Sequence, residues 1–116
     1  MSLAIKRVYE PVSTKDGVRI LVDRLWPRGL SKERAAVDLW LKAIAPSTEL
    51  RQWFGHEPAR WAELRRKYFA ELASHADEVD QVRKLAKRRR VTLVYGARDT
   101  EHNDAVALLD YLESQR

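Results

Sequence analysis

The segment VTLVYGARDTEHNDAVALLDYL, from Val91 to Leu112, decides the predicted fold. Its first five residues, Val91 to Tyr95, are almost wholly apolar and rich in β-branched side chains, which predicts a central strand buried on both faces. Gly96 ends this run, and a polar turn then leads into an amphipathic helix. A buried strand that runs through such a turn into a helix start is where α/β proteins commonly bind anions and small substrates.

Two other stretches resemble strands. Leu3 to Tyr9 and Val18 to Asp23 alternate apolar and polar residues with the period of a half-buried strand. Val37 to Lys42 also alternates and is compatible with a third short strand or with a helix. A helix precedes and follows the last strand, so we expect at least one parallel pairing.

Helices are predicted between these strands from their end signals and apolar spacing. One continuous stripe is expected from Trp61, Leu64, Tyr68 and Leu72, and an inner face from Val79, Val82 and Ala86. The residues expected at helix ends are Ser31, the Pro46-Ser47-Thr48 triplet, Gly55, Glu57, Pro58 and Asp77. The sequence therefore predicts a single α/β domain over residues 1–116, with a small, mostly parallel sheet of about four strands and helices packed on it.

Composition narrows the class of protein. The 116 residues are 45% hydrophobic and 34% charged, which is typical of one globular domain. The absence of cysteine excludes thiol catalysis and thiolate metal sites, and it is consistent with a reducing cytosol. No apolar run approaches the length of a membrane span, and the first residues lack a signal-peptide core, so we expect a cytoplasmic protein.

The net charge of +5 is unevenly placed. Six basic residues precede the last strand, namely Arg83, Lys84, Lys87, Arg88, Arg89 and Arg90. They indicate either a patch for nucleic acid or an acidic partner, or a helix C-terminus whose cations complement the helix dipole and lie in water. No aromatic residue interleaves the cluster as a base-stacking surface would require, which favours the second interpretation.

Four motifs resemble the domain-of-unknown-function 488 family, in particular its short YeaO-like members. They are DRLWPRG (Asp23 to Gly29), DLWLKAIAPS (Asp38 to Ser47), LRQWFGH with the helix after it (Leu50 to Tyr68) and YGARDTEHNDA (Tyr95 to Ala105). The resemblance covers nearly the whole chain and implies a compact α/β domain of bacterial or archaeal type, with no settled activity. The motif positions it marks are Arg24, Trp26, Pro27, Arg28, Gly29, Lys42, Arg51, His56, Tyr95, Ala97, Asp99, His102 and Asn103.

The turn after the last strand is the first candidate site. If Asp99 or Thr100 caps the helix, the backbone N–H groups that follow could bind an anion with help from Arg98. The alternative is that Asp99 satisfies those donors itself. His102 and Asn103 are expected in the first helical turn, where His102 is either a neutral base or ligand or a hydrogen-bonded structural residue.

A second group follows the second strand. Arg24 and Arg28 flank a rigid Trp-Pro turn and make a plausible fork for carboxylate or phosphate at the same sheet edge. Arg24 could instead pair with Asp23 or Asp38, and Trp26 could belong to the core. The composite site fails if this turn and the last turn lie on opposite sides of the sheet.

A third, weaker group consists of Lys42, Arg51 and His56. His56 could join His102 and Asp99 around a metal ion, since two imidazoles and a carboxylate are legitimate ligands. The spacing contains no HxxxH or HxH pair and no GxGxxG or GxxxxGK loop, so neither a metal nor a cofactor is predicted.

The leading functional hypothesis is a polar, anion-binding pocket at the strand ends. Its ligand-binding residues would be Arg24, Arg28, Arg98, Lys42 and Arg51, and its catalytic residues His102, Asp99, Asn103 and Tyr95. The chemistry would be hydrolysis or acid–base catalysis on a small molecule that bears phosphate or carboxylate. The alternatives are a non-catalytic ligand-sensing or interaction domain, and a nucleic-acid-binding accessory protein that uses the Arg83–Arg90 cluster. The sequence does not decide whether the protein is an enzyme, nor its oligomeric state.

Overall fold

A four-stranded, wholly parallel sheet forms the centre of the protein, in the order β1-β4-β2-β3. The strands are β1 (Leu3–Arg7), β2 (Val18–Leu21), β3 (Leu39–Trp40) and β4 (Val91–Tyr95). The computed structural model describes residues 2–114. It confirms the predicted α/β class; of the domain predicted over 1–116, residues 1, 115 and 116 lie outside the described residues.

Strand β4 is central, as its composition predicts. It pairs with β1 from Leu3↔Val91 to Arg7↔Tyr95 and with β2 on its other side. All five of its residues are buried. A strand with a neighbour on each side and a covered face above and below is largely apolar, because its side chains do not reach water, and the hydroxyl of the buried Thr92 donates to the Asp16 carbonyl at 2.7 Å.

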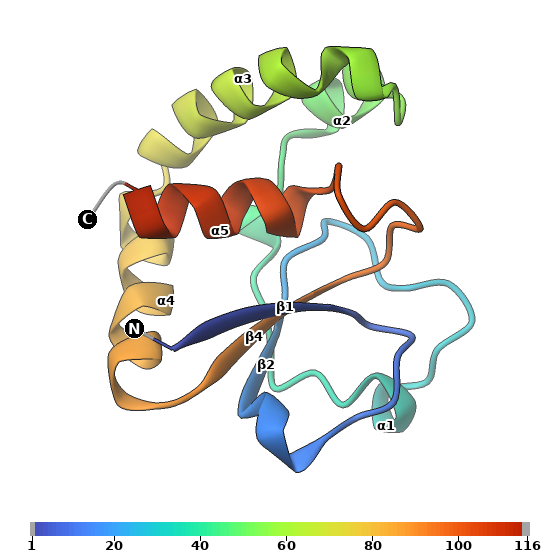
Figure 1. Ribbon diagram of the computed structural model, residues 1–116, viewed down its shortest axis with the longest axis vertical. Helices are drawn as coiled ribbons and strands as arrows, with labels where there is room; N and C mark the ends of the chain where they lie inside the picture. The colour runs from blue at the N-terminus through green and yellow to red at the C-terminus, as the bar shows by residue number, and fades with distance from the viewer. Residues whose placement is uncertain (1, 115–116) are drawn as a thin grey trace.

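Four helices cover one face of the sheet (Figure 1). They are α2 (Thr48–Phe54), α3 (Trp61–Ala73), α4 (Ala76–Arg88) and α5 (Asp104–Ser114), and their apolar side chains pack on Leu93 and its neighbours. The other face is covered more thinly, by the short α1 (Lys32–Ala35) and by Trp26 and Trp40, which meet edge to face. Three 3₁₀ turns complete the chain: η1 (Thr14–Asp16), η2 (Lys42–Ile44) and η3 (Pro58–Arg60).

Most helix ends follow the sequence signals. Ser31 and Ser47 each accept a backbone N–H three residues ahead, and Gly55 ends α2 in the left-handed conformation. The predicted cap at Asp77 is wrong, because α4 begins at Ala76 and places Asp77 inside its first turn. An acidic residue there still favours the helix through the dipole, which is why the two positions look alike in the sequence.

A buried ion pair supports the thinly covered face. The Arg19 guanidinium donates to Asp16 at 2.7 Å and to the carbonyls of Ala35 and Ala36. Burial raises the pKa of Asp16, but hydrogen bonds from the Ser13 N–H, Lys6 and Arg19 outweigh it, so the pKa lies below its ordinary value. Within residues 2–114, no helix is long and apolar enough to cross a membrane.

Candidate functional site

A pocket of about 420 Å³ opens at the carboxyl edge of the sheet. The turn after β2 and the turn after β4 both line it, because these strands are parallel neighbours and end at the same edge. Helix α2 and the residues after it close the pocket from the helical side. Its wall is largely apolar and includes Leu25, Trp26, Pro27, Phe54 and Leu64.

Two carboxyl groups meet on the pocket wall. Asp23 follows β2 and Asp104 opens α5, and a hydrogen bond joins their side chains. Burial and the neighbouring Asp23 charge raise the pKa of Asp104 well above its ordinary value of 3.8. Because a bond between two carboxyl groups needs one proton, Asp104 keeps its proton at a pH at which an isolated aspartate would have lost it.

Backbone contacts hold this pair at the start of the last turn. The Gly96 N–H donates to Asp23 Oδ2 at 2.8 Å. A Cβ at position 96 would lie 3.3 Å from the same oxygen, a tight contact that glycine avoids. From β1, Arg7 donates to the carbonyls of Ala97, at 2.8 Å, and Gly96, at 3.3 Å. The turn is therefore fastened to both neighbouring strands.

Asn103 caps helix α5, and this corrects the expectation that Asp99 or Thr100 does so. Its Oδ1 accepts the Val106 N–H at 2.9 Å, and its Nδ2 donates to the Asp99 carbonyl at 2.9 Å. The side chain also bonds the buried Tyr95 hydroxyl, whose pKa is raised chiefly by burial. Asn103 and His102 thus precede the helix instead of forming its first turn.

Asp99 organises the turn before the helix. Its Oδ1 accepts the N–H groups of Glu101 and His102, and its Oδ2 lies 2.9 Å from His102 Nδ1. The Glu101 N–H is the main reason the pKa of Asp99 lies below its ordinary value, with His102 next. With Nδ1 taken by the carboxylate, the His102 ring presents Nε2 as its remaining nitrogen. The ring packs edge to face on Trp61 and lines the pocket.

The predicted cations have unequal roles. Arg24 lines the pocket, but its guanidinium donates to the carbonyls of Pro46, at 3.2 Å, and Ala45, at 3.3 Å, and so positions the start of α2. It pairs with neither Asp23 nor Asp38. Arg28 and Arg51 are exposed and lie on the pocket rim, where charged groups of a ligand could reach them.

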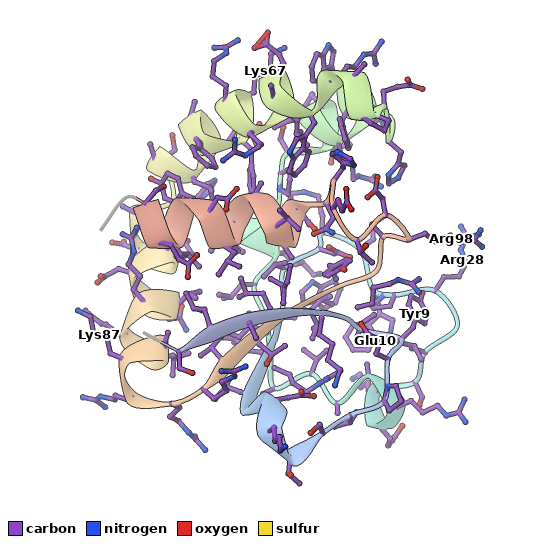
Figure 2. The ribbon with its side chains drawn as sticks, viewed as in Figure 1. Tyr9, Glu10, Arg28, Lys67, Lys87 and Arg98 are labelled. Carbon is purple, nitrogen blue, oxygen red and sulfur yellow. The ribbon has the colours of Figure 1, made fainter. Side chains whose placement is uncertain are left out.

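Two predicted ligand-binding cations lie elsewhere. Lys42 sits over the Trp40 ring, 4.1 Å from its centroid, and Arg98 is exposed; neither is among the residues that line the pocket. Figure 2 shows Arg98 and Arg28 extending outward from the same side of the molecule. His56 lies on the rim against Phe54. In the described part of the chain, no three His, Cys, Asp or Glu side chains form a group that could hold a metal ion.

The Asp23–Asp104 pair was not predicted from the sequence as a feature of the site. Asp23 was considered only as a partner for Arg24, and Asp104 was assigned no role. A signal was present, because Asp23 is the last residue of the predicted strand from Val18 and so was expected at its carboxyl end. No local pattern indicated that Asp104, on another element, would meet it.

The comparisons with known proteins agree with this architecture. Residues 2–116 match the family described as the inactive DUF488-N3 subclade. The chain belongs to this family. It is 48% identical over 114 residues to the uncharacterized protein YeaO of Escherichia coli K12, covering 98% of this chain and 99% of that protein.

Two more distant relatives also match over nearly their whole length. The uncharacterized proteins Mb3100c of Mycobacterium bovis and Rv3073c of Mycobacterium tuberculosis are each 40% identical over 111 residues, covering 96% of this chain and 93% of theirs. No solved structure was found to match. The resemblance to the 488 family and its YeaO-like members is therefore confirmed, and the family supplies no reaction.

Proposed function

We propose that this domain binds a small polar molecule in the pocket and holds it without transforming it. The observation that carries the proposal is the Asp23–Asp104 pair, set in an otherwise largely apolar wall of a pocket of about 420 Å³. Pockets of roughly 300–1,000 Å³ with few polar groups in apolar walls are typical of small-molecule sites. The pair offers acceptors to a ligand N–H or ammonium group, while Arg28 and Arg51 on the rim suit a carboxylate or phosphate.

Two observations support binding without turnover. The chain has no cysteine, and the described residues that line the pocket include no serine, threonine or lysine, so the thiol, aliphatic hydroxyl and amine nucleophiles are missing from its wall. The family description also carries the word inactive. Within the pocket, anion binding is proposed only for Arg28 and Arg51 on the rim, because the Arg24 guanidinium already donates to backbone carbonyls.

The acid–base enzyme remains the second candidate because of one contact. Asp99 engages His102 Nδ1, which leaves Nε2 to accept a proton from a bound substrate, while the Asp104 carboxyl, whose pKa is raised, supplies an acid in the same pocket. This arrangement suits a phosphate- or carboxylate-bearing substrate as well as a held ligand.

A thermal-shift screen with a metabolite library tests the binding proposal. We expect some zwitterionic compounds to raise the melting temperature of the wild type and to lose that effect in Asp104→Ala and in Arg51→Ala. Lys32→Gln, on the opposite face, is the matched control and should respond like the wild type. If no compound stabilises the wild type, the proposal fails.

Any stabilising compound is then incubated with the protein and followed by mass spectrometry. Unchanged compound after long incubation supports a holding or sensing domain. Turnover that disappears in His102→Gln while the thermal shift persists would establish the enzyme instead, because a lost base reduces rate before it reduces affinity.

A further inference from the structure

Four consecutive cations lie at the opposite end of β4 from the pocket. Lys87 and Arg88 end helix α4, and Arg89 and Arg90 connect it to β4. All four are exposed. We call them the basic surface. In Figure 2, Lys87 points outward on the side of the molecule away from Arg28 and Arg98.

The charge of the basic surface is not neutralised within the described chain. No described carboxylate forms an ion pair with any of its four residues, whereas their neighbour Lys84 pairs with Asp80 at 3.0 Å. Arg83 is also engaged, since its guanidinium donates to the carbonyls of Tyr111 and Leu112. The six-residue basic cluster of the sequence therefore divides into two cations with bonding partners in the chain and four exposed cations that pair with no described carboxylate.

These cations surround a shallow hollow of about 350 Å³ whose other lining residues are Ser2 and Ala86. The hollow has a fixed base, because the Ser2 N–H bonds the Ala86 carbonyl and the Val91 N–H bonds the Ser2 carbonyl. Arg90 also donates to Ser2 Oγ at 3.2 Å. The cations are thus arranged around sheet and helix backbone instead of a loose tail.

The helix dipole explains the placement of only two of the four cations in the basic surface. Cations in the last turn of a helix are stabilised by its dipole, which accounts for Lys87 and Arg88. The effect decays beyond the last turn, while Arg89 and Arg90 follow the last helical residue. Their exposure and lack of carboxylate partners remain to be explained.

We propose that the basic surface binds the phosphate backbone of duplex nucleic acid without reading its sequence. Guanidinium and ammonium groups bind phosphate oxygens, and adjacent cations can reach successive phosphates. The residues that line the hollow include no aromatic ring in the described chain, so unpaired bases would find nothing to stack on. A duplex, which offers phosphates and hides its bases, fits this surface better than a single strand.

Fluorescence anisotropy with a mixed-sequence DNA duplex of about 20 base pairs, titrated between about 50 and 200 mM salt, tests the proposal. Four phosphate contacts predict a slope of about −3.6 for log affinity against log salt concentration. Lys87→Gln/Arg88→Gln/Arg89→Gln should flatten that slope by about 3 and weaken binding at every salt concentration. An RNA duplex of the same length shows whether the backbone type matters.

A matched triple variant, Lys32→Gln/Arg34→Gln/Lys67→Gln, removes the same charge from surfaces away from α4. It should keep most of the slope; equal weakening in both triples would mean that only net charge matters and would overturn the proposal. Two other results also overturn it: no measurable duplex binding at the lowest salt concentration, and binding of polyglutamate as tight as that of the duplex. Circular dichroism confirms that each variant is folded.

Discussion

The two segments that flank β4 are both rich in polar side chains and use them differently. After the strand, from 96 to 104, the side chains of Asp99, His102, Asn103 and Asp104 bond other groups of the chain, as in Asn103 with Tyr95 and Val106. Before the strand, the basic surface makes one side-chain hydrogen bond among its described residues, from Arg90 to Ser2. The turn after β4 is therefore held by side-chain hydrogen bonds, whereas the basic surface before β4 is mainly exposed to water.

This difference indicates, at each end of β4, which polar side chains stabilise the fold and which are available to a ligand or partner. Polar groups in the pocket turn are needed to hold the turn, so their presence alone is weak evidence of a ligand. The cations of the basic surface hold little in place, and their removal should leave the fold intact. Substitutions on both sides of β4 therefore test whether the two ends differ as described.

The largest effect is expected for Asn103→Ala. It removes the α5 cap and the contacts with Tyr95 and the Asp99 carbonyl, so we expect a loss of about 2 kcal/mol in the free energy of unfolding. Urea denaturation measures it, with Arg89→Ala as the control at the other end of β4. Comparable losses in the two variants would erase the distinction between the segments.

Arg24→Met should cost somewhat less, about 1.5 kcal/mol. The substitution keeps much of the aliphatic bulk but leaves the carbonyls of Ala45 and Pro46, both buried, without their guanidinium donor. Denaturation curves at neutral pH measure the loss. A variant as stable as the wild type would show that Arg24 is available to a ligand after all.

Asp104→Asn should stabilise the protein, in a manner that depends on pH. The pKa of Asp104 is raised in the folded state, so above its ordinary value of 3.8 the unfolded chain ionises first and wild-type stability falls as pH rises toward the folded pKa. Asparagine removes that loss at about 1.4 kcal/mol per unit of pKa difference. We expect a gain at pH 8 that disappears near pH 3.5.

Unfolding curves across that pH range give the comparison, with Asp80→Asn on the surface of α4 as the control. A gain that is equal at both ends of the range would mean that the carboxyl pair does not hold a proton. The hydrogen bond between Asp23 and Asp104 would then not contribute to holding the turn after β4.

The smallest effect is expected for Lys87→Gln/Arg88→Gln/Arg89→Gln. Its free energy of unfolding should change by less than about 1 kcal/mol, since exposed cations contribute little to stability. Denaturation at low and high salt checks this. A large loss would make the basic surface structural and remove the contrast between the ends of β4.

Local physics made much of the fold predictable. The stretch from Val91 to Tyr95 was recognisable as a buried strand because a strand covered on both faces is largely apolar. Ser31, Ser47 and Gly55 marked helix ends because capping depends on a few neighbouring backbone groups. Where two local solutions compete, as for Asp99 and Asn103, the sequence favoured the wrong cap.

The sequence by itself determined the α/β class and the central strand, while the meeting of the β2 and β4 turns at one sheet edge was left open until the structure showed it. The class and the central strand follow from periodicity and from the geometry of parallel strands. Only the tertiary structure decided which charges are available. In the folded protein Asp104 lies beside Asp23, and the Arg24 guanidinium donates to backbone carbonyls just before α2. The side chains of residues 87 to 90 remain exposed to water. Partners distant in the chain are chosen by packing, and no local pattern records that choice.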